Sequence, residues 1–503
     1  MHLDLIQFFL LISSINKMIT LIFPIHLFEL KYAKILNKQT VIYIIEEPTY
    51  FTKFNFHKMK LILHRASMKQ YQYYLVSNGY VVKYIEFDKV TAFYKKIKDM
   101  KVNCYDVYDH DLTKKLTKLF GQHIEFHDSP MFIETTKELD EYVNNNTSYN
   151  LNKYTYHHDS SFYRWQRRRL NLLMDKNGQD PLFGKWSYDT ENRKPFPKDY
   201  KEELLISVNN DFIKEAKNYI NKNFPNNFGN TDNFIYPIDH NSAKLWLKSF
   251  IKDKLLNFGP IQDAVSKTII VGNHSLLSPL LNIGLLVPEY VIKQVRKLTI
   301  TKENIKSIEA FIRQIIGWRS YVHLLYNLHG NEMKEMNKLN HTNKLSQNWY
   351  TAKTGIVPID CLIEKVKDYA YLHHIERLMY IGNFMLLTKI DPKDVYKWFM
   401  EVSIDSYDWV MVANVFGMSQ YALDNIRMMA KPYFSSCNYL MKMSDFEKGE
   451  WCNIWNALFW KFVDENKEIL KKNYITATFV SKLNKMENKS KIIKFANEII
   501  KKY

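Results

Sequence analysis

The spacing of hydrophobic and polar residues changes several times along the first quarter of the chain. Val41–Ile45 and Val81–Ile85 are short apolar runs of β-branched and aromatic residues, typical of strands buried on both faces. Lys58–Ser77, which lies between them, has the spacing of a helix. A strand, a helix and a second strand in this order predict a parallel α/β unit.

The pattern is different from about residue 206 onward, where strand signals nearly vanish. Long amphipathic stretches cover 240–257, 302–327, 361–388, 392–411 and 453–471. Turn signals separate them at Gly259-Pro260, Asp391-Pro392 and Lys431-Pro432. This pattern predicts a mostly helical C-terminal part of about 300 residues.

The segment 139–205 is polar and carries an asparagine run at 144–146 and prolines at 195 and 197, so we expect a linker there. Residues 1–17 include an apolar run that is too short to span a bilayer and is a poor signal peptide. We therefore expect an extension at 1–17, an α/β domain at 18–138, the linker at 139–205 and a helical domain at 206–503. Whether Met1 or Met18 is the start stays open.

Composition adds a possible partner and a compartment. The formal net charge is +17 over 503 residues, as in proteins that bind a polyanion. The same charge also follows from a chain rich in Lys, Asn, Ile and Tyr throughout, so charge alone leaves nucleic-acid binding open. The four cysteines have irregular spacing and no CxxC pair, which favours a reducing, intracellular compartment and gives no local metal motif.

Arginine is concentrated in one short segment. Arg164-Trp-Gln-Arg-Arg-Arg169 has four arginines in six residues, and an aromatic and polar run from Phe183 to Arg193 follows. Arginines beside tryptophan suit a surface that contacts phosphates and stacks on bases. The plainer interpretations are a solvated helix face and a structured loop.

Two adjacent histidines, His373 and His374, stand in an apolar run from Tyr369 to Met379 that we interpret as a helix interior. A polar ring buried in a helix needs a partner. An imidazole also suits proton transfer near neutral pH. On these residues alone, a satisfied core pair and a reactive pair are equally good interpretations.

Further polar groups are set among apolar ones in three other segments. The run from His274 to Gly284 offers hydroxyls beside a proline and suits either a phosphate or a capped helix start. Gly317 to Tyr326 places an arginine among aromatics, as in a flat ligand site or a core helix. The segment from Ile404 to Gln420 and the phenols of Tyr433 and Tyr439 either face a heterocycle or pack in the core.

Together these segments resemble, in order, the motifs of the deoxyribodipyrimidine photolyase-related proteins, which include bacterial-type (6-4) photolyases and cryptochrome-like relatives. The resemblance extends from Met18 to about residue 465. It implies the photolyase/cryptochrome fold, with an α/β, Rossmann-like antenna domain on a parallel sheet and an all-α domain that binds FAD. It also implies light-driven DNA repair, in which excited reduced FAD gives an electron to a flipped-out (6-4) photoproduct and a histidine assists with a proton.

The resemblance assigns residues to these roles. His374 matches the proton donor, His373 its neighbour, and Tyr433 and Tyr439 the tyrosines of the lesion pocket. The residues expected at the flavin are Ser275, Leu276, Leu277, Ser278, Trp318, Arg319, Asp405 and Asn414. The residues expected at DNA are Arg164, Arg167, Arg168, Lys185 and Arg193.

The chain departs from the family at its iron–sulfur cluster. Glu447 and Glu450 stand where the family has two cluster cysteines, Cys361 and Cys452 lie near the other two positions, and Cys437 matches none. Carboxylates are hard ligands that hold such a cluster poorly, so we expect no cluster and no other metal.

The aromatic path for electrons also differs. The family's Trp-Tyr pair reads Trp398-Phe399 here, and Lys353 aligns with a further family tryptophan, for which Trp349 or Tyr350 is a substitute. The family's lumazine antenna has only the indistinct candidates Glu46 and Glu47.

Three hypotheses follow. The first is a FAD-dependent (6-4) photolyase, a lyase that acts on UV-damaged DNA. This enzyme would be a monomer that does not associate with a membrane. The second is a cryptochrome-like blue-light photoreceptor that keeps FAD but does not repair. The third is a DNA-binding relative without photochemistry. The sequence does not exclude cyclobutane dimers as the substrate.

Overall fold

The computed structural model describes residues 18–145, 161–188, 193–202, 210–424, 426, 428–429 and 431–502. The expected extension at 1–17, Asn146 and the middle of the expected linker lie outside the described residues, as do residues 189–192 of the aromatic motif. None of the described helices is long and apolar enough to cross a membrane.

The N-terminal part is built on a five-stranded parallel sheet with the order β3-β2-β1-β4-β5. The strands are β1 (Met18–Ile22), β2 (Val41–Ile45), β3 (Val81–Ile85), β4 (Lys101–Tyr105) and β5 (Ile124–His127). The predicted strands and the helix between them, α3 (Lys58–Ser77), are confirmed to the residue. The prediction that β3 is buried on both faces was wrong, because β3 is an edge strand and Val81 is 41% exposed.

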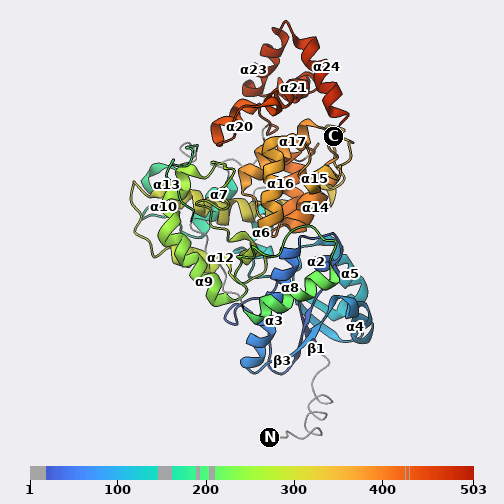
Figure 1. Ribbon diagram of the computed structural model, residues 1–503. Coiled ribbons are helices and arrows are strands. Elements are labelled where there is room, and N and C mark those ends of the chain that lie inside the picture. Colours follow the sequence, from blue (N-terminus) through green and yellow to red (C-terminus); the bar gives the residue numbers. More distant parts are fainter. Residues whose placement is uncertain are drawn as a thin grey trace.

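Helices cover this sheet, as Figure 1 shows for α3, α4 (Val90–Ile97) and α5 (His110–Phe120). α8 (Asp211–Asn223), which comes after the expected boundary at residue 206, packs along α3. Arg65 of α3 joins them, because its guanidinium contacts Glu215 of α8 and Glu46 at the end of β2. In space, α8 therefore belongs with the α/β part.

The rest of the chain is helical and continues away from the sheet (Figure 1). The predicted stretch 240–257 forms one helical rod made of α9 (His240–Ser249), η6 (Phe250–Lys254) and α10 (Leu255–Ile261). The stretch 302–327 forms α13 (Ile305–Ile312), η7 (Arg313–Arg319) and α14 (Ser320–Met333). The last stretch forms α21 (Glu450–Glu465) and α22 (Lys467–Leu470).

Two predicted stretches are interrupted. The first divides into α16 (Val357–Tyr369), η8 (Glu376–Gly382) and α17 (Asn383–Leu387), because Ala370 has a left-handed backbone with φ of 55° that ends α16. The second divides into α18 (Pro392–Val402) and α19 (Asp408–Val412). The two breaks lie side by side, since the N–H of Ile404 donates to the carbonyl of Ala370 over 3.0 Å.

One glycine lets the α/β and helical parts approach closely. His57, at the start of α3, contacts the carbonyls of Val366 and Lys367 of α16 through its Nε2 atom, at 3.0 and 3.1 Å. Gly229 lies against the same ring with φ of 94°, and a Cβ atom there would come within 2.0 Å of the imidazole. A side chain at residue 229 would therefore displace His57 from this contact.

Candidate active site

The two adjacent histidines lie at the start of a helix and not in its interior, which corrects the expectation from sequence. His373 caps the new helix: its Nδ1 atom accepts from the N–H of Ile375 over 3.3 Å, and Glu376 Oε2 accepts from the N–H of His373 over 2.9 Å. This reciprocal pair is a capping box with histidine at the cap position. The break in the predicted helix thus fixes the orientation of the His373 ring.

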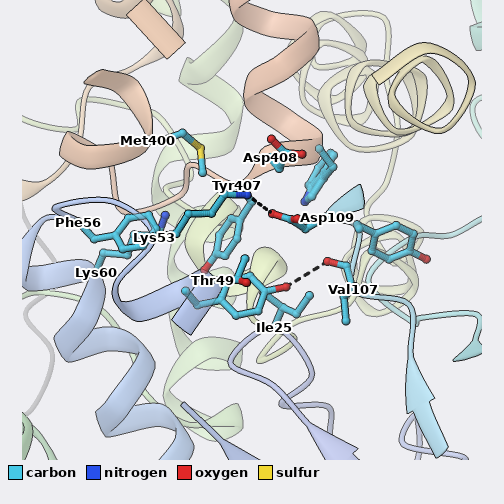
Figure 2. Close-up of a pocket in the computed structure, with 13 residues that line it drawn as sticks. Ile25, Thr49, Lys53, Phe56, Lys60, Val107, Asp109, Met400, Tyr407 and Asp408 are labelled. Atoms are coloured by element: carbon cyan, nitrogen blue, oxygen red, sulfur yellow. Dashed lines mark hydrogen bonds and ion pairs between the residues drawn. The ribbon is translucent and has the colours of Figure 1, made fainter. Parts of the chain in front are cut away.

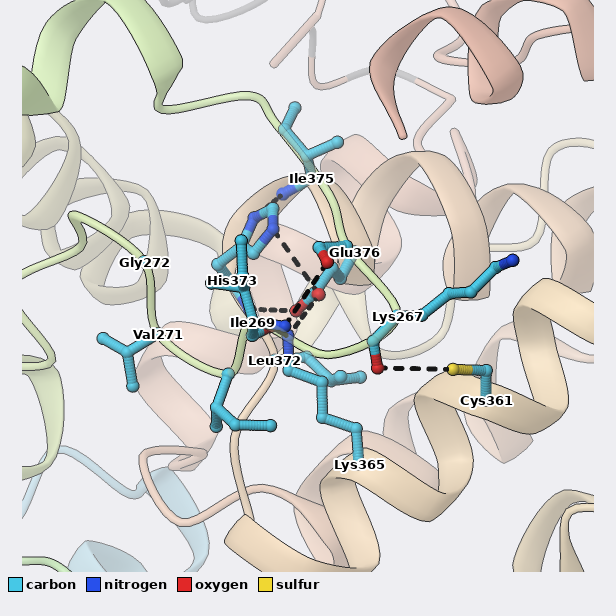
Figure 3. A network of polar contacts seen from close by, with 12 residues as sticks. Lys267, Ile269, Val271, Gly272, Cys361, Lys365, Leu372, His373, Ile375 and Glu376 are labelled. Carbon is cyan, nitrogen blue, oxygen red and sulfur yellow. Dashed lines mark hydrogen bonds and ion pairs between the residues drawn. The ribbon is translucent and has the colours of Figure 1, made fainter. Parts of the chain in front are cut away.

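Glu376 is fully buried and is paired with Lys365 of α16, whose Nζ atom lies 2.5 Å from Oε1 (Figure 3). Lys365 also donates to the carbonyl of Ile269 over 2.9 Å. Burial raises the pKa of Glu376, and the charge of Lys365 opposes that shift. Burial lowers the pKa of His373 well below its ordinary value, so His373 is a neutral ring held on a buried ion pair.

His374 has the opposite environment. Its side chain is 52% exposed, and its Nε2 atom lies 3.3 Å from Oδ1 of Asp263, which is 8% exposed. Burial raises the pKa of Tyr439 to about 12, with smaller effects from the nearby Asp263, Arg193 and Tyr433. Asp263 therefore lies beside His374 and near Tyr439, and Tyr433 and Arg193 are also near Tyr439.

A third histidine completes this neighbourhood, and the sequence analysis did not include it among the site residues. His274 stacks on His373 with ring centroids 4.6 Å apart and planes 14° apart, and it lies 5.6 Å from the ring of His374. Its Nδ1 atom contacts the carbonyl of Val271, and its buried Nε2 atom has no partner among the described residues. The available signal was its place at the head of the predicted phosphate-binding segment.

The three histidines could be taken for a metal site, since their ligand atoms all lie within 4.8 Å of one another. Two observations argue against one. First, Nδ1 of His373 already accepts the capping hydrogen bond. Second, the rings of His274 and His373 are nearly parallel, so their in-plane lone pairs point side by side and do not converge on one ion.

Asp405 lies in the second helix break and contacts Ser278, another of the residues expected at the flavin. Its carboxylate accepts from Ser278 Oγ over 2.6 Å and from Arg377 Nη2 over 2.8 Å, and its carbonyl accepts from Asn282 over 2.9 Å. Arg377 also donates to the carbonyl of Leu372 over 2.6 Å, which ties the two breaks together. Sequence reasoning missed Arg377, although it lies in the same motif as the histidine pair.

The backbone between Ser275 and Ser278 has capacity for an anionic ligand. Among the hydrogen bonds of the described residues, none is donated by the four N–H groups of this segment, and Leu276 holds a left-handed φ of 50°. Buried N–H groups in folded proteins normally have an acceptor. Phosphate oxygens of a dinucleotide fit these free donors.

Three other residues expected at the flavin have internal partners. Arg319 is buried and donates to Asn282 Oδ1 over 2.5 Å and to the carbonyl of Met131, so it joins the helical part to the segment after β5. Asn414 donates to the carbonyl of Val410 over 2.7 Å and is partly buried. Trp318 lies one residue before Arg319, and its ring centroid is 6.5 Å from that of Tyr321.

Trp398 is fully buried in α18 and contacts Trp349, with ring centroids 6.2 Å apart and a hydrogen bond of 3.0 Å from its Nε1 atom to the carbonyl of Trp349. The phenol of Tyr350 instead donates to Glu401 over 2.5 Å. Of the two substitutes considered for the missing tryptophan, Trp349 is therefore the one in contact with Trp398.

The arginine segment forms α7 (Ser161–Arg169), and its members differ in exposure. Arg167 is 1% exposed and donates to the carbonyls of Leu172, Leu173 and Trp186, so it holds the following turn and does not reach a surface. This corrects its place among the expected DNA contacts. Arg164 and Arg168 lie over the Trp186 ring at 5.3 and 5.0 Å, and Arg168 and Lys185 are exposed.

Figure 2 shows a pocket where strands β1, β2 and β4 end and the helical part begins. It is lined by Ile25, Thr49, Tyr50, Val107, Asp109 and Tyr407, among others. The antenna candidates are engaged elsewhere. Glu46 contacts Arg65 at 2.7 Å, and Glu47 contacts Lys115 at 2.5 Å. Ligands of open parallel sheets bind at this edge, but neither glutamate offers a free carboxylate.

The cysteines of the expected cluster region lie in two places. Cys361 is partly buried beside the carbonyl of Lys267 (Figure 3), whereas Cys437 and Cys452 are buried next to each other. Glu447 and Glu450 are exposed. The absence of an iron–sulfur cluster stays a prediction.

The comparisons with known proteins show which family the chain belongs to. The family model for deoxyribodipyrimidine photo-lyase-related protein matches residues 20–236. A (6-4) photolyase of Agrobacterium fabrum is 32% identical over 463 residues, covering 87% of this chain and 89% of that protein. An uncharacterised protein of Acanthamoeba polyphaga mimivirus is 42% identical over 123 residues, covering 24% of this chain and 98% of that protein.

Two solved structures have a similar fold. A bacterial class III photolyase from Agrobacterium tumefaciens has a TM-score of 0.55 at 16% identity and covers 97% of this chain and 98% of its own. A cryptochrome of Synechocystis has a TM-score of 0.55 at 11% identity and covers 94% and 93%. The chain has the photolyase/cryptochrome fold and belongs to the deoxyribodipyrimidine photolyase-related family.

Proposed function

We propose that this chain is a FAD-dependent photolyase that repairs the (6-4) pyrimidine–pyrimidone photoproduct in UV-damaged DNA. One observation carries the proposal: of the two adjacent histidines, His374 is exposed and faces a carboxylate, while His373 is buried. Repair of this lesion returns a hydroxyl from one base to the other, which needs a proton donor that the flipped-out base can reach.

His374 is the proposed donor. Asp263 offers a carboxylate at 3.3 Å from its Nε2 atom, which can accept a hydrogen bond from that atom. His373 is the proposed positioning residue, because the capping box and the pair of Glu376 with Lys365 leave its ring one orientation. Tyr433 and Tyr439 supply aromatic surface and phenol groups beside a base in this neighbourhood.

The free N–H groups from Ser275 to Ser278 fit the phosphates of FAD, and the ion pair of Arg377 with Asp405 fits the polar edge of its ring system. Reduced FAD, when bound, supplies the excited electron donor. Trp318, Arg319 and Asn414 stay proposed members of the pocket wall. Trp398 and Trp349 are the proposed route by which electrons resupply the cofactor.

The proposed DNA surface consists of Arg164, Arg168, Lys185 and Arg193, without Arg167. Arg164 and Arg168 lie on Trp186, an arrangement that suits contact with phosphates and stacking on bases. The excess of 17 positive charges acts in the same direction. We also propose that the chain acts as a monomer inside the cell. A lumazine antenna, if bound, would lie near the pocket at the ends of β1, β2 and β4, which we call the strand-end pocket.

A photoreceptor without repair is the second candidate. Phe399 stands where the family has a tyrosine, and a phenylalanine cannot lose a proton after oxidation. Repair needs FAD in its reduced state, so a less efficient path for photoreduction favours this candidate.

The test is a repair assay. The purified chain with bound FAD is illuminated with blue light and a reductant, together with an oligonucleotide that carries one (6-4) photoproduct, and the bases are separated by chromatography. We expect restored thymines in light and none in darkness. Bound FAD with no restored thymines would contradict the enzyme and favour the photoreceptor. A parallel oligonucleotide with a cyclobutane dimer tests the substrate.

A further inference from the structure

Two cysteines and a methionine lie on α20 and α21, two neighbouring helices near the C-terminal end of the chain (Figure 1). Cys437 and Met441 are four residues apart on α20 (Cys437–Met443), so their side chains lie on one face of that helix. Cys452 is in the first turn of α21, and its Sγ atom lies 3.6 Å from Sδ of Met441. The buried thiols of Cys437 and Cys452 are close enough to act on each other electrostatically. We call these three residues the sulfur triad.

The two cysteines of the sulfur triad are buried, Met441 is partly buried, and hydrogen bonds hold one sulfur in place. Cys437 is 2% exposed and Cys452 is 1% exposed. Asn456 of α21 donates to Cys437 Sγ over 3.2 Å, and its side-chain oxygen accepts from the N–H of Cys437 over 3.1 Å. Hydrogen bonds of this kind orient a ligand and stabilise its charge when a metal binds. Burial raises the pKa of the Cys437 thiol to about 11, and the hydrogen bond from Asn456 and the charge of Lys448 oppose that shift.

We propose that the sulfur triad binds a soft monovalent metal ion, with Cu(I) as the ion. Two thiolates and a thioether are the donors that select Cu(I). Zn²⁺ favours four ligands, so here it would need nitrogen or carboxylate ligands besides the two thiolates. Glu447 and Glu450 are exposed and do not supply them. An iron–sulfur cluster needs four thiolates, and this place offers two.

Binding is a substitution without oxidation or reduction. The S–H bonds of Cys437 and Cys452 break, two protons are released to solvent, and three copper–sulfur bonds form, so copper stays Cu(I). The ion would join α20 to α21. Because Tyr439 is on α20 between two of the ligands, the metal would also fix the helix that carries this residue. The inference does not depend on the proposed repair activity.

The experiment uses the full chain, reduced and without oxygen, with its thiols counted first. Cu(I) is supplied as its acetonitrile complex in the presence of bicinchoninate as a competitor, and retained copper is measured after desalting. We expect one Cu(I) per chain. The variants Cys437→Ser and Cys452→Ser should retain less than about a tenth of that amount, whereas Cys361→Ser, a matched control at the cysteine beside Lys267, should retain all of it.

Two further variants keep the test valid if a cysteine variant folds poorly. Met441→Leu conserves volume and should weaken Cu(I) binding, and Asn456→Leu should weaken it about tenfold through the lost hydrogen bonds. X-ray absorption should show a copper shell made of sulfur. The proposal is overturned if the wild-type chain loses all copper to bicinchoninate, if Cys437→Ser and Cys361→Ser retain equal amounts, or if the shell is nitrogen, which would point to the histidines.

Discussion

The Nε2 atom of His374 lies 3.3 Å from Oδ1 of Asp263, a residue 111 positions earlier in the chain. The contact gives the exposed imidazole a carboxylate partner beside the two tyrosines of the proposed lesion pocket. Its neighbour His373 is buried on the other side of the chain turn and stacks on His274. One dipeptide thus presents one ring to solvent and one ring to the core.

Replacing Asp263 with asparagine tests the value of this partner. Asp263→Asn keeps the size of the side chain and removes its charge, and a hydrogen bond to a charged group contributes about 1.5 kcal/mol, so we expect repair to slow by roughly tenfold. FAD content should not change. Equal single-turnover repair yields in Asp263→Asn and the wild-type chain would show that the carboxylate has no part in the reaction.

The ion pair of Lys365 with Glu376 predicts a large and specific effect on stability. Lys365→Met leaves Glu376 buried without a partner, which should lower the free energy of unfolding by about 3–5 kcal/mol in urea titrations. Lys367→Met is the matched control, since Lys367 pairs with Glu364 at the surface, and it should change stability by less than about 1 kcal/mol.

A double replacement separates the two possible reasons for that loss. Lys365→Met combined with Glu376→Leu removes the unpaired charge and should recover part of the lost stability. If the double variant is less stable than Lys365→Met alone, the main role of Glu376 is to cap the helix at His373, and the buried charge is secondary.

Lys60 predicts a dependence of stability on pH. Its amine is buried in the strand-end pocket region and donates to the carbonyl of Ser406, and burial lowers its pKa to about 7. Between pH 7 and 10.5 the amine of Lys60 is protonated in the unfolded chain but not in the folded chain. The free-energy cost of burying this lysine is therefore complete below pH 7, and it disappears as the pH rises toward 10.5.

Lys60→Met should therefore stabilise the chain, and more at low pH than at high pH. We expect the gain in the free energy of unfolding to be roughly 2–3 kcal/mol larger at pH 6.5 than at pH 9.5. Urea titrations of both proteins at the two pH values measure it. A gain that is the same at both would show that the amine keeps an ordinary proton affinity.

The contact of Trp398 with Trp349 predicts the route of photoreduction. Trp398→Phe and Trp349→Phe should each slow the light-driven reduction of bound FAD, because phenylalanine is much harder to oxidise than tryptophan. Trp165→Phe, in α7, is the control, and its bound FAD should be reduced at the wild-type rate. The absorbance of FAD under illumination with an external reductant gives the rates. Unchanged rates in both contact variants would place the route elsewhere.

The sequence predicted the regular elements well and the helix breaks poorly. Val41–Ile45, Lys58–Ser77 and Val81–Ile85 have unambiguous spacing, and the structure has them at those residues. The apolar pattern continues through 361–388, and it does not reveal that Ala370 takes a left-handed backbone. The break depends on two polar contacts that the apolar pattern does not encode. One is the local cap formed by His373 and Glu376, and the other is the tertiary hydrogen bond from Ile404 to Ala370.

The candidate site shows the same division. The motifs brought His374, Tyr439 and Asp405 to attention, but their partners Asp263 and Arg377 became visible only when distant segments were placed together. Arg167 illustrates the opposite error. Four arginines in six residues suggested a common role, yet the fold turns one of them inward to bind three carbonyls. Composition does not specify which side of a helix faces solvent.

His374 is the proposed proton donor in repair of the (6-4) photoproduct, and its replacement can be compared with that of a distant histidine. His374→Ala and His123→Ala, an exposed histidine in the α/β part, are each loaded with FAD, and the yield of restored thymines per absorbed photon is measured in single turnover. We predict that His374→Ala loses at least about 100-fold, as for removal of a general acid, while FAD content and DNA affinity persist and His123→Ala repairs normally. Repair by His374→Ala at the wild-type yield would show that His374 does not deliver the proton.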